Sequence, residues 1–185
     1  MTTTLPSDHP LFTLFRDIGR KNLLGVVGIR RPEVADYVCD MMIRFAHVDE
    51  IRRVRDLAGR PLEDVGEMLE AADRAAAIPR GQSMRDVRRH IGDFTLFFLG
   101  MFPEWVARHA TTRLPGVYVD WSSEGKRSYR IVSEFRSAPF EDEAPLFAAL
   151  ADAYDFCVVG LNLIRNDLRQ LTDPRYAWLR AALDE

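Results

Sequence analysis

The sequence has few of the residues that build redox or metal chemistry, with two cysteines and four histidines among 185 residues. Cys39 and Cys157 are far apart, and each lies in an apolar helical pattern, where a free cysteine behaves as a small buried hydrophobe. A reducing, cytoplasmic location is therefore expected. The histidines are scattered over different segments, at His9, His47, His90 and His109. Their spacing alone predicts no metal site.

The chain also lacks a long apolar run. Its most apolar window, residues 94–102, is bounded by Asp93 and Pro103. It is far shorter than the roughly 20 residues needed to cross a bilayer, so it indicates a core segment and no membrane contact. The start, MTTTLPSDHP, has neither the basic segment nor the apolar stretch of a secretory signal, and we expect residues 1–9 to be a disordered N-terminus.

Lysine is nearly absent, since Lys21 and Lys126 are the only two, and the formal net charge is −3. Without a global positive field, nucleic acid is disfavoured as a partner. The excess of arginine fits a GC-rich genome as well as anion recognition, and we favour the genomic explanation. The GxxxxGK[ST], GxGxxG, HExxH, CxxC and GxSxG signatures are absent too, so the common chemistries lack their usual markers.

What is present is the composition of a globular domain, with 47% hydrophobic and 29% charged residues. In residues 145–171, apolar side chains recur at alternating steps of three and four, which predicts a helix near the middle of a bundle. The same spacing predicts a second long helix over 33–51. Further helices are expected over 10–18, 61–76, 83–102, 103–110, 123–135 and 174–183. We therefore predict an all-α, single-domain bundle of six or seven helices within residues 10–185.

Two short segments do not fit the helical pattern. Residues 23–29 and 115–121 are β-branched and bounded by turn residues, so they could pair as a small ribbon. Because two isolated strands are only marginally stable, we favour irregular packed loops.

The first candidate site lies on the predicted helix 83–102. His90 and Asp93 are three residues apart and therefore neighbours on one face. Such a pair can orient an imidazole for proton transfer or offer two ligands to a metal. Glu104 would extend the same column if Pro103 only kinked the helix axis. Polar pairs at this spacing are more often structural contacts, and that interpretation is the one we favour.

Two further residues of this segment are candidates for lining a ligand pocket. Gly100 inside a helix costs about 1 kcal/mol relative to alanine, which indicates close approach by another helix or by a ligand. Phe97 belongs to an aromatic stripe that could floor an apolar pocket, although core packing explains the stripe more simply. The stripe consists of Phe94, Phe97, Phe98 and Phe102.

The second candidate site is a basic stretch at the start of the predicted helix 123–135. Its members are Lys126, Arg127, Tyr129 and Arg130. One edge of such a helix could hold a carboxylate or phosphate. Glu124 and Glu134 supply counter-charges, so we favour a solvated face. The arginines of residues 51–56 likewise follow Asp49 and Glu50, which indicates ion pairs rather than a groove for a polyanion.

The words HIGDFTLF, MFPE and GKRSY resemble those of an uncharacterised family of bacterial all-helical cytosolic proteins. The likeness extends from the middle third of the chain to its C-terminal helix. It implies a bacterial cytosolic protein, and it implies no activity, cofactor or ligand.

Two functional hypotheses follow from these patterns. The first is a non-enzymatic binding or regulatory protein that takes a small ligand or a protein partner in an inter-helix pocket. Because the apolar faces of the predicted helices are wide for one small bundle, we also expect a homodimer. The alternative is a metalloprotein or enzyme in which His90 is base or metal ligand, Asp93 orients it and Glu104 is a second carboxylate. In it, the edge of Lys126, Arg127 and Arg130 holds an anionic substrate; the cofactor is unknown.

Overall fold

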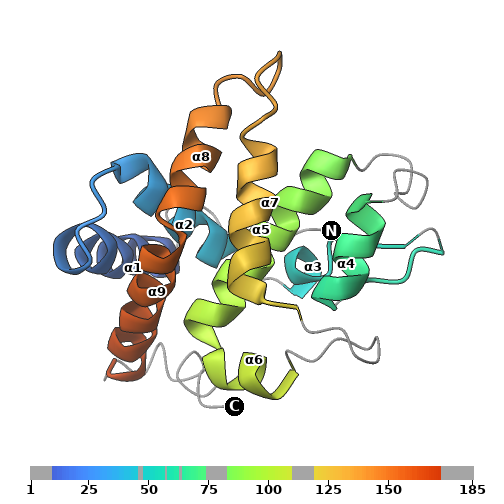
Figure 1. Ribbon diagram of the computed structural model, residues 1–185. Helices are drawn as coiled ribbons and strands as arrows, with labels where there is room; N and C mark the ends of the chain where they lie inside the picture. Colours follow the sequence, from blue (N-terminus) through green and yellow to red (C-terminus); the bar gives the residue numbers. More distant parts are fainter. Residues whose placement is uncertain are drawn as a thin grey trace.

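The computed structural model describes residues 10–45, 48–56, 58–62, 64–73, 83–109 and 119–171. Within these ranges the chain forms nine α-helices and one short π-helix, and no strand (Figure 1). The helices are α1 (Pro10–Arg20), η1 (Lys21–Val26), α2 (Pro32–Phe45), α3 (Val48–Ile51), α4 (Val65–Asp73), α5 (Met84–Met101), α6 (Pro103–His109), α7 (Trp121–Val132), α8 (Ala144–Asp152) and α9 (Tyr154–Arg169). The predicted all-α class is confirmed.

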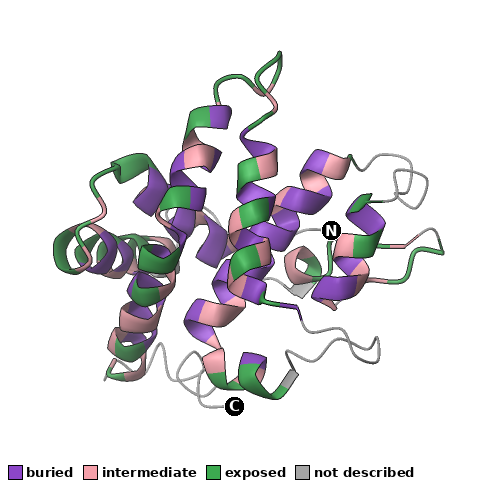
Figure 2. Cartoon of the chain, viewed as in Figure 1, coloured by how far each residue is buried: buried purple, intermediate pink, exposed green. Residues whose placement is uncertain are grey.

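The helix α5 packs against α2, α4, α6, α7 and α9. It begins at a capping box, in which Ser83 Oγ accepts the Asp86 N–H at 3.1 Å and the Asp86 carboxylate accepts the Ser83 N–H at 3.2 Å. Its residues from Ile91 to Phe97 are all buried, and Figure 2 shows purple on the surfaces where α5 meets α7. The predicted helix 83–102 is therefore present, and it is enclosed more fully than the segment 145–171 that we expected at the middle.

The predicted helix 145–171 is two helices. The chain breaks at Ala153, and α8 and α9 are bent by 75° to each other. The spacing of apolar residues continues unchanged through the bend, and the buried seam from Phe147 to Leu168 contains the side chains that we predicted. The error arose because neither glycine nor proline marks the break.

The N-terminal helices also depart from the predicted boundaries. The first helix reaches Arg20 and continues as η1, so residues 23–26, predicted as loop or ribbon, are helical. The predicted helix 33–51 is divided into α2 and the single turn of α3. The predicted helix at 61–76 is observed as α4, which begins at Val65. The other expected segments, residues 1–9, 74–76, 110, 115–118 and 174–183, lie outside the described residues.

The helix α7 begins two residues before the predicted start because Asp120 caps it. The Asp120 carboxylate accepts the N–H groups of Ser122 and Ser123 at 3.0 and 3.2 Å. Among the described helices, none alone is both long and apolar enough to cross a bilayer; the bent pair α8 and α9 meets that test only when the two are taken together.

Candidate functional site

Asp93 is the centre of a buried polar network that joins α2, α5 and α7. Its Oδ1 accepts hydrogen bonds from the hydroxyls of Tyr37 and Tyr129, each at 2.7 Å. Arg44 donates to Oδ2 at 3.1 Å, and Arg89 Nε donates to the Tyr37 hydroxyl at 3.1 Å. Burial raises the pKa of both tyrosines above the ordinary value, so both stay protonated donors at neutral pH.

His90 is buried one turn away from Asp93, and the two side chains have different partners. The imidazole packs against Phe45 and Phe94, with ring centroids 5.8 and 6.0 Å away. It hydrogen-bonds to the backbone of Ile51, while its Nε2 has no protein partner. Burial lowers the pKa of His90 to about 4, so the ring is neutral at pH 7.

A small polar cavity of about 80 Å³ lies beside His90 and Asp93. Three arginines and three acids line it, together with His90 and Phe45; the six charged residues are Arg44, Arg53, Arg89, Glu50, Asp86 and Asp93. The opposite charges balance, and the volume suits ordered water rather than an organic ligand. The structure thus brings His90 and Asp93 to one cavity, in which the hydrogen bonds of Asp93 are made within the protein and the His90 Nε2 has no protein partner.

Glu104 does not join them. The helix α5 ends at Met101, the backbone of Phe102 after it is not helical (φ −136°, ψ 51°), and α6 then runs in a new direction (Figure 1). Pro103 therefore marks a break and not a kink, which is why the predicted column fails. The exposed Glu104 carboxylate instead accepts two hydrogen bonds from the buried guanidinium of Arg165, at 2.7 and 3.1 Å, and these lower the pKa of Glu104.

Among the described residues, the candidate metal site also lacks the ligands that it would need. Within the described part of the chain, no three His, Cys, Asp or Glu side chains are grouped so that they could hold a metal ion. His9 and His47 lie outside that part, and nothing is described of the His109 side chain.

Gly100 and Phe97 are core positions. A Cβ placed on Gly100 would overlap the side chain of Leu161, so the glycine lets α9 approach α5 closely. The sequence predicted that either a helix or a ligand approaches Gly100, and the structure shows that the neighbour is α9. Phe97 is buried against Phe45 and Phe102, with ring centroids 5.2 and 5.7 Å away. Neither residue lines the cavities described in this section.

The basic stretch on α7 is neutralised by acids of this chain. Lys126 Nζ lies 2.6 Å from Asp155, and Arg130 lies 2.6 Å from Asp152. Arg127 faces Glu124 at 3.7 Å. Tyr129 points the other way, into the Asp93 network. The predicted anion-holding edge is therefore a set of ion pairs, of which those of Lys126 and Arg130 connect α7 with α9 and α8, while that of Arg127 lies within α7.

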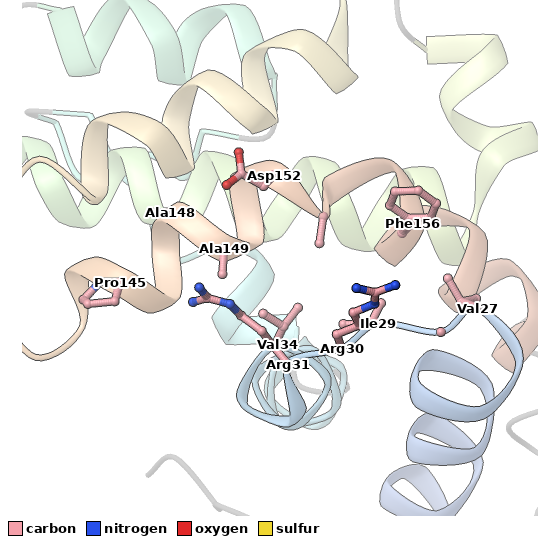
Figure 3. A pocket seen from close by; sticks show the side chains of 12 residues that line it. Val27, Ile29, Arg30, Arg31, Val34, Pro145, Ala148, Ala149, Asp152 and Phe156 are labelled. Atoms are coloured by element: carbon pink, nitrogen blue, oxygen red, sulfur yellow. The ribbon is translucent and has the colours of Figure 1, made fainter.

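A larger cavity that the sequence did not indicate lies between the start of α2 and the bend between α8 and α9 (Figure 3). We call it the elbow groove; its volume is about 580 Å³. Its apolar lining consists of Val27, Ile29, Val34, Pro145, Ala148, Ala149, Ala153 and Phe156. Its charged side chains are Arg30, Arg31 and Asp152.

The local fold between η1 and α2 places both arginines at the groove. Gly28 adopts φ +81°, a conformation that favours glycine, and the Ile29 N–H donates to the Leu23 carbonyl at 2.9 Å. The turn brings Arg30 and Arg31 to the side that faces α8 and α9, where Figure 3 shows their guanidinium groups extending toward the groove. We predicted residues 23–29 to be a packed loop, and the two arginines that follow this segment were not predicted to form a site.

The charges around the groove leave the arginine pair largely uncompensated. Asp152 is held by Arg130 at 2.6 Å. Arg31 has a distant partner in Glu33, at 3.9 Å, and both side chains are more than half exposed. Among the described residues, Arg30 forms no ion pair. The signal that could have revealed this site is the sequence GIRRP, in which a glycine turn precedes two arginines and the first turn of a helix.

The two cavities differ in what they can hold. The elbow groove has the volume of pockets that take drug-sized molecules, and the cavity beside His90 does not. Two guanidinium groups next to aliphatic side chains can bind an anion and an apolar body at the same time.

No family model, curated protein or solved structure matches this chain.

Proposed function

We propose that this chain is a non-enzymatic ligand-binding protein, and that the elbow groove takes a small molecule with an apolar body and one anionic group. The observation that carries the proposal is the position of Arg30 and Arg31 beside an aliphatic lining of about 580 Å³. Guanidinium groups bind carboxylates and phosphates with paired hydrogen bonds, and burial of the apolar body supplies affinity.

The lining favours binding over catalysis. Among its residues, no serine, cysteine, histidine or tyrosine is available as a nucleophile or base, and its carboxylate, Asp152, is engaged by Arg130. The rival hypothesis places the chemistry at His90 and Asp93. Against it, Asp93 already accepts hydrogen bonds from two tyrosines and Arg44, and the cavity there is small.

Isothermal titration calorimetry with three probe anions tests the proposal. The probes are octanoate, phenyl phosphate and naphthalene-2-sulfonate, each of which carries one anionic group on a different apolar body. We expect at least one of them to bind, and the double variant Arg30→Ala/Arg31→Ala to weaken that binding at least tenfold. Arg16→Ala is the matched control, because Arg16 is an exposed arginine paired with Asp40 away from the groove lining.

The result that overturns the proposal is equally clear. If none of the three probes binds the wild-type protein, or if the double variant and Arg16→Ala behave alike, the groove is not the binding site. The charge-matched anion methyl sulfate, which has almost no apolar body, should bind much more weakly than the probes.

The bacterial origin, the cytoplasmic location and the homodimer are further parts of the proposal. Cys39 and Cys157 are free and buried, as in proteins of reducing compartments. A dimer would need an apolar contact surface, and sedimentation velocity over a range of protein concentrations tests for it. A single species with the mass of one chain at all concentrations would contradict the dimer and leave the ligand site unaffected.

A further inference from the structure

The apolar surface of the elbow groove continues beyond its mouth. In the described part of the chain, the large hydrophobic side chains that are clearly exposed are Val26 (61%), Phe156 (59%) and Val159 (52%). All three lie on η1 and α9, which pack together where Leu23 and Val27 approach Gly160. Exposed apolar residues gathered at one place mark a binding surface more often than a scattered set does.

Phe156 connects the groove to this surface. It lines the groove beside Val27, at the end away from Pro145 (Figure 3). Val159 follows three residues later and lies one turn further along the same side of α9. The apolar surface therefore forms a track that leads from the arginine pair, past Phe156, to Val159.

The side chains of the lining restrict the chemistry of the ligand body. Apart from the two arginines and the engaged Asp152, no lining side chain can make a hydrogen bond. Sugars and nucleosides need several directional partners, and beyond these charged groups the lining offers none for their hydroxyl groups. It has one aromatic ring, that of Phe156, while alanine, valine, isoleucine and proline form the rest. Such a surface suits an aliphatic body better than a stacked ring system.

We infer that the ligand is a single-chain anionic amphiphile of the fatty-acid class, with its headgroup on Arg30 and Arg31 and its alkyl chain directed past Phe156 toward Val159. The inference rests on the proposed function and adds the nature of the apolar body. A flexible chain fits an elongated track that is open on one side, because it can follow the surface without a matching cavity.

A series of free alkanoates tests the inference by calorimetry on the full chain. Hexanoate, octanoate and decanoate are used below their micelle-forming concentrations. We expect affinity to rise with each added methylene, by up to about fourfold, the value for full burial, because the track is open on one side. Octyl glucoside, which has an eight-carbon alkyl chain and a neutral headgroup, should bind at least tenfold more weakly than octanoate. Decyl phosphate beside decanoate shows which headgroup is preferred.

A variant on the track separates the chain from the headgroup. Val159→Ser should weaken decanoate binding and leave hexanoate binding unchanged, because the shorter chain ends before this position. Val159 is exposed, so the substitution leaves the core intact. Asn166→Ser is the matched control, since Asn166 is an exposed position on the same helix beyond the track.

The possible failures are distinguishable. If naphthalene-2-sulfonate binds and affinity for alkanoates does not depend on chain length, the inference is wrong while the proposed function stands. If vesicles containing anionic phospholipid bind the protein and free decanoate does not, the surface recognises a lipid bilayer, and the inference is wrong. If no anion binds in any form, the proposed function fails as well.

Discussion

At the scale of single residues, the most consequential side chain in the core is Asp93. Replacing it with alanine would leave the hydroxyls of Tyr37 and Tyr129 and the Arg44 guanidinium without their shared acceptor. Breaking a buried charge pair in this way costs about 3 kcal/mol or more. We predict that the free energy of unfolding of Asp93→Ala, measured in urea, falls by about this amount.

The exposed pair of Lys126 and Asp155 provides the control for that measurement. Asp155→Ala removes a carboxylate of an ion pair that is largely exposed, with side-chain exposures of 39% and 68%, so it should change stability by less than about 1 kcal/mol. An equal loss in the two variants would show that the Asp93 network contributes no more than a surface pair.

His90 gives the fold a pH dependence of its own. Burial lowers its pKa to about 4 in the folded protein, against about 6.5 in an unfolded chain. Between these values the unfolded state binds a proton that the folded state does not bind. The contribution of His90 to the free energy of unfolding is therefore complete above about pH 6.5 and is lost as the pH falls from about 6.5 to 4. The contribution is of the order of 3 kcal/mol at most, since one pKa unit corresponds to about 1.4 kcal/mol.

Urea unfolding of wild type and His90→Gln at several pH values tests this dependence. Glutamine can still donate to the Ile51 carbonyl but does not titrate, so the difference in stability between the two proteins should change across this pH window. A difference that stays constant from pH 7 to pH 4 would show that His90 takes up its proton equally well in both states.

The buried network around Asp93 was only partly predictable from the sequence. His90 and Asp93 stood out as polar residues on an apolar helix, and the structure places both at one buried cavity. Their partners, Tyr37 and Arg44 on α2 and Tyr129 on α7, come from distant parts of the chain. The spacing within one helix carries no information on which distant residues meet it, so the network could not be predicted.

At the scale of elements, glycine positions record where helices approach most closely. A Cβ on Gly100 would overlap Leu161, whose Cβ is part of the contact and cannot swing away. Overpacking of this kind typically costs 1–3 kcal/mol, which is larger than the gain of about 1 kcal/mol in helix propensity. We therefore predict that Gly100→Ala lowers the melting temperature, as measured by circular dichroism.

Gly25 supplies the matched comparison for Gly100. A Cβ there would meet nothing within 4 Å, and its φ is not in the left-handed region. Gly25→Ala should therefore leave the melting temperature unchanged or raise it slightly. If Gly100→Ala proves as harmless as Gly25→Ala, α9 is not in close contact with α5 at this position.

Some element boundaries that local chemistry marks were predicted, although the Asp120 cap of α7 was missed, and the boundary at Ala153 was missed because no local signal marks it. Ser83 and Pro32 mark the starts of α5 and α2, because capping and proline preferences act within a few residues. The bend at Ala153 has no such marker. Next to the bend, Tyr154 is buried in the core and its hydroxyl donates to Thr95 Oγ1 at 2.7 Å, a contact with a distant part of the chain that local sequence does not reveal.

At the scale of the whole molecule, the elbow groove exists only because separate parts of the chain meet. Residues 27–34 supply one wall and residues 145–156 the other. Hydrophobic periodicity predicts which face of each helix is buried, and it does not predict where two helices leave a space between them. The class of the fold was therefore predictable, whereas the site that we propose was not.

A large side chain at Ala148 would fill the elbow groove. Ala148 lines the groove and is only partly buried, so Ala148→Trp places a large side chain in the groove without displacing the core. We expect the melting temperature to change little and the binding of octanoate to fall at least tenfold, because the indole occupies the volume that the ligand needs. Ala107→Trp, at an exposed position of α6 outside the groove lining, should leave binding unchanged. Unchanged affinity in Ala148→Trp would place the octanoate site elsewhere on the molecule, even if Arg30 and Arg31 proved to matter through their charge.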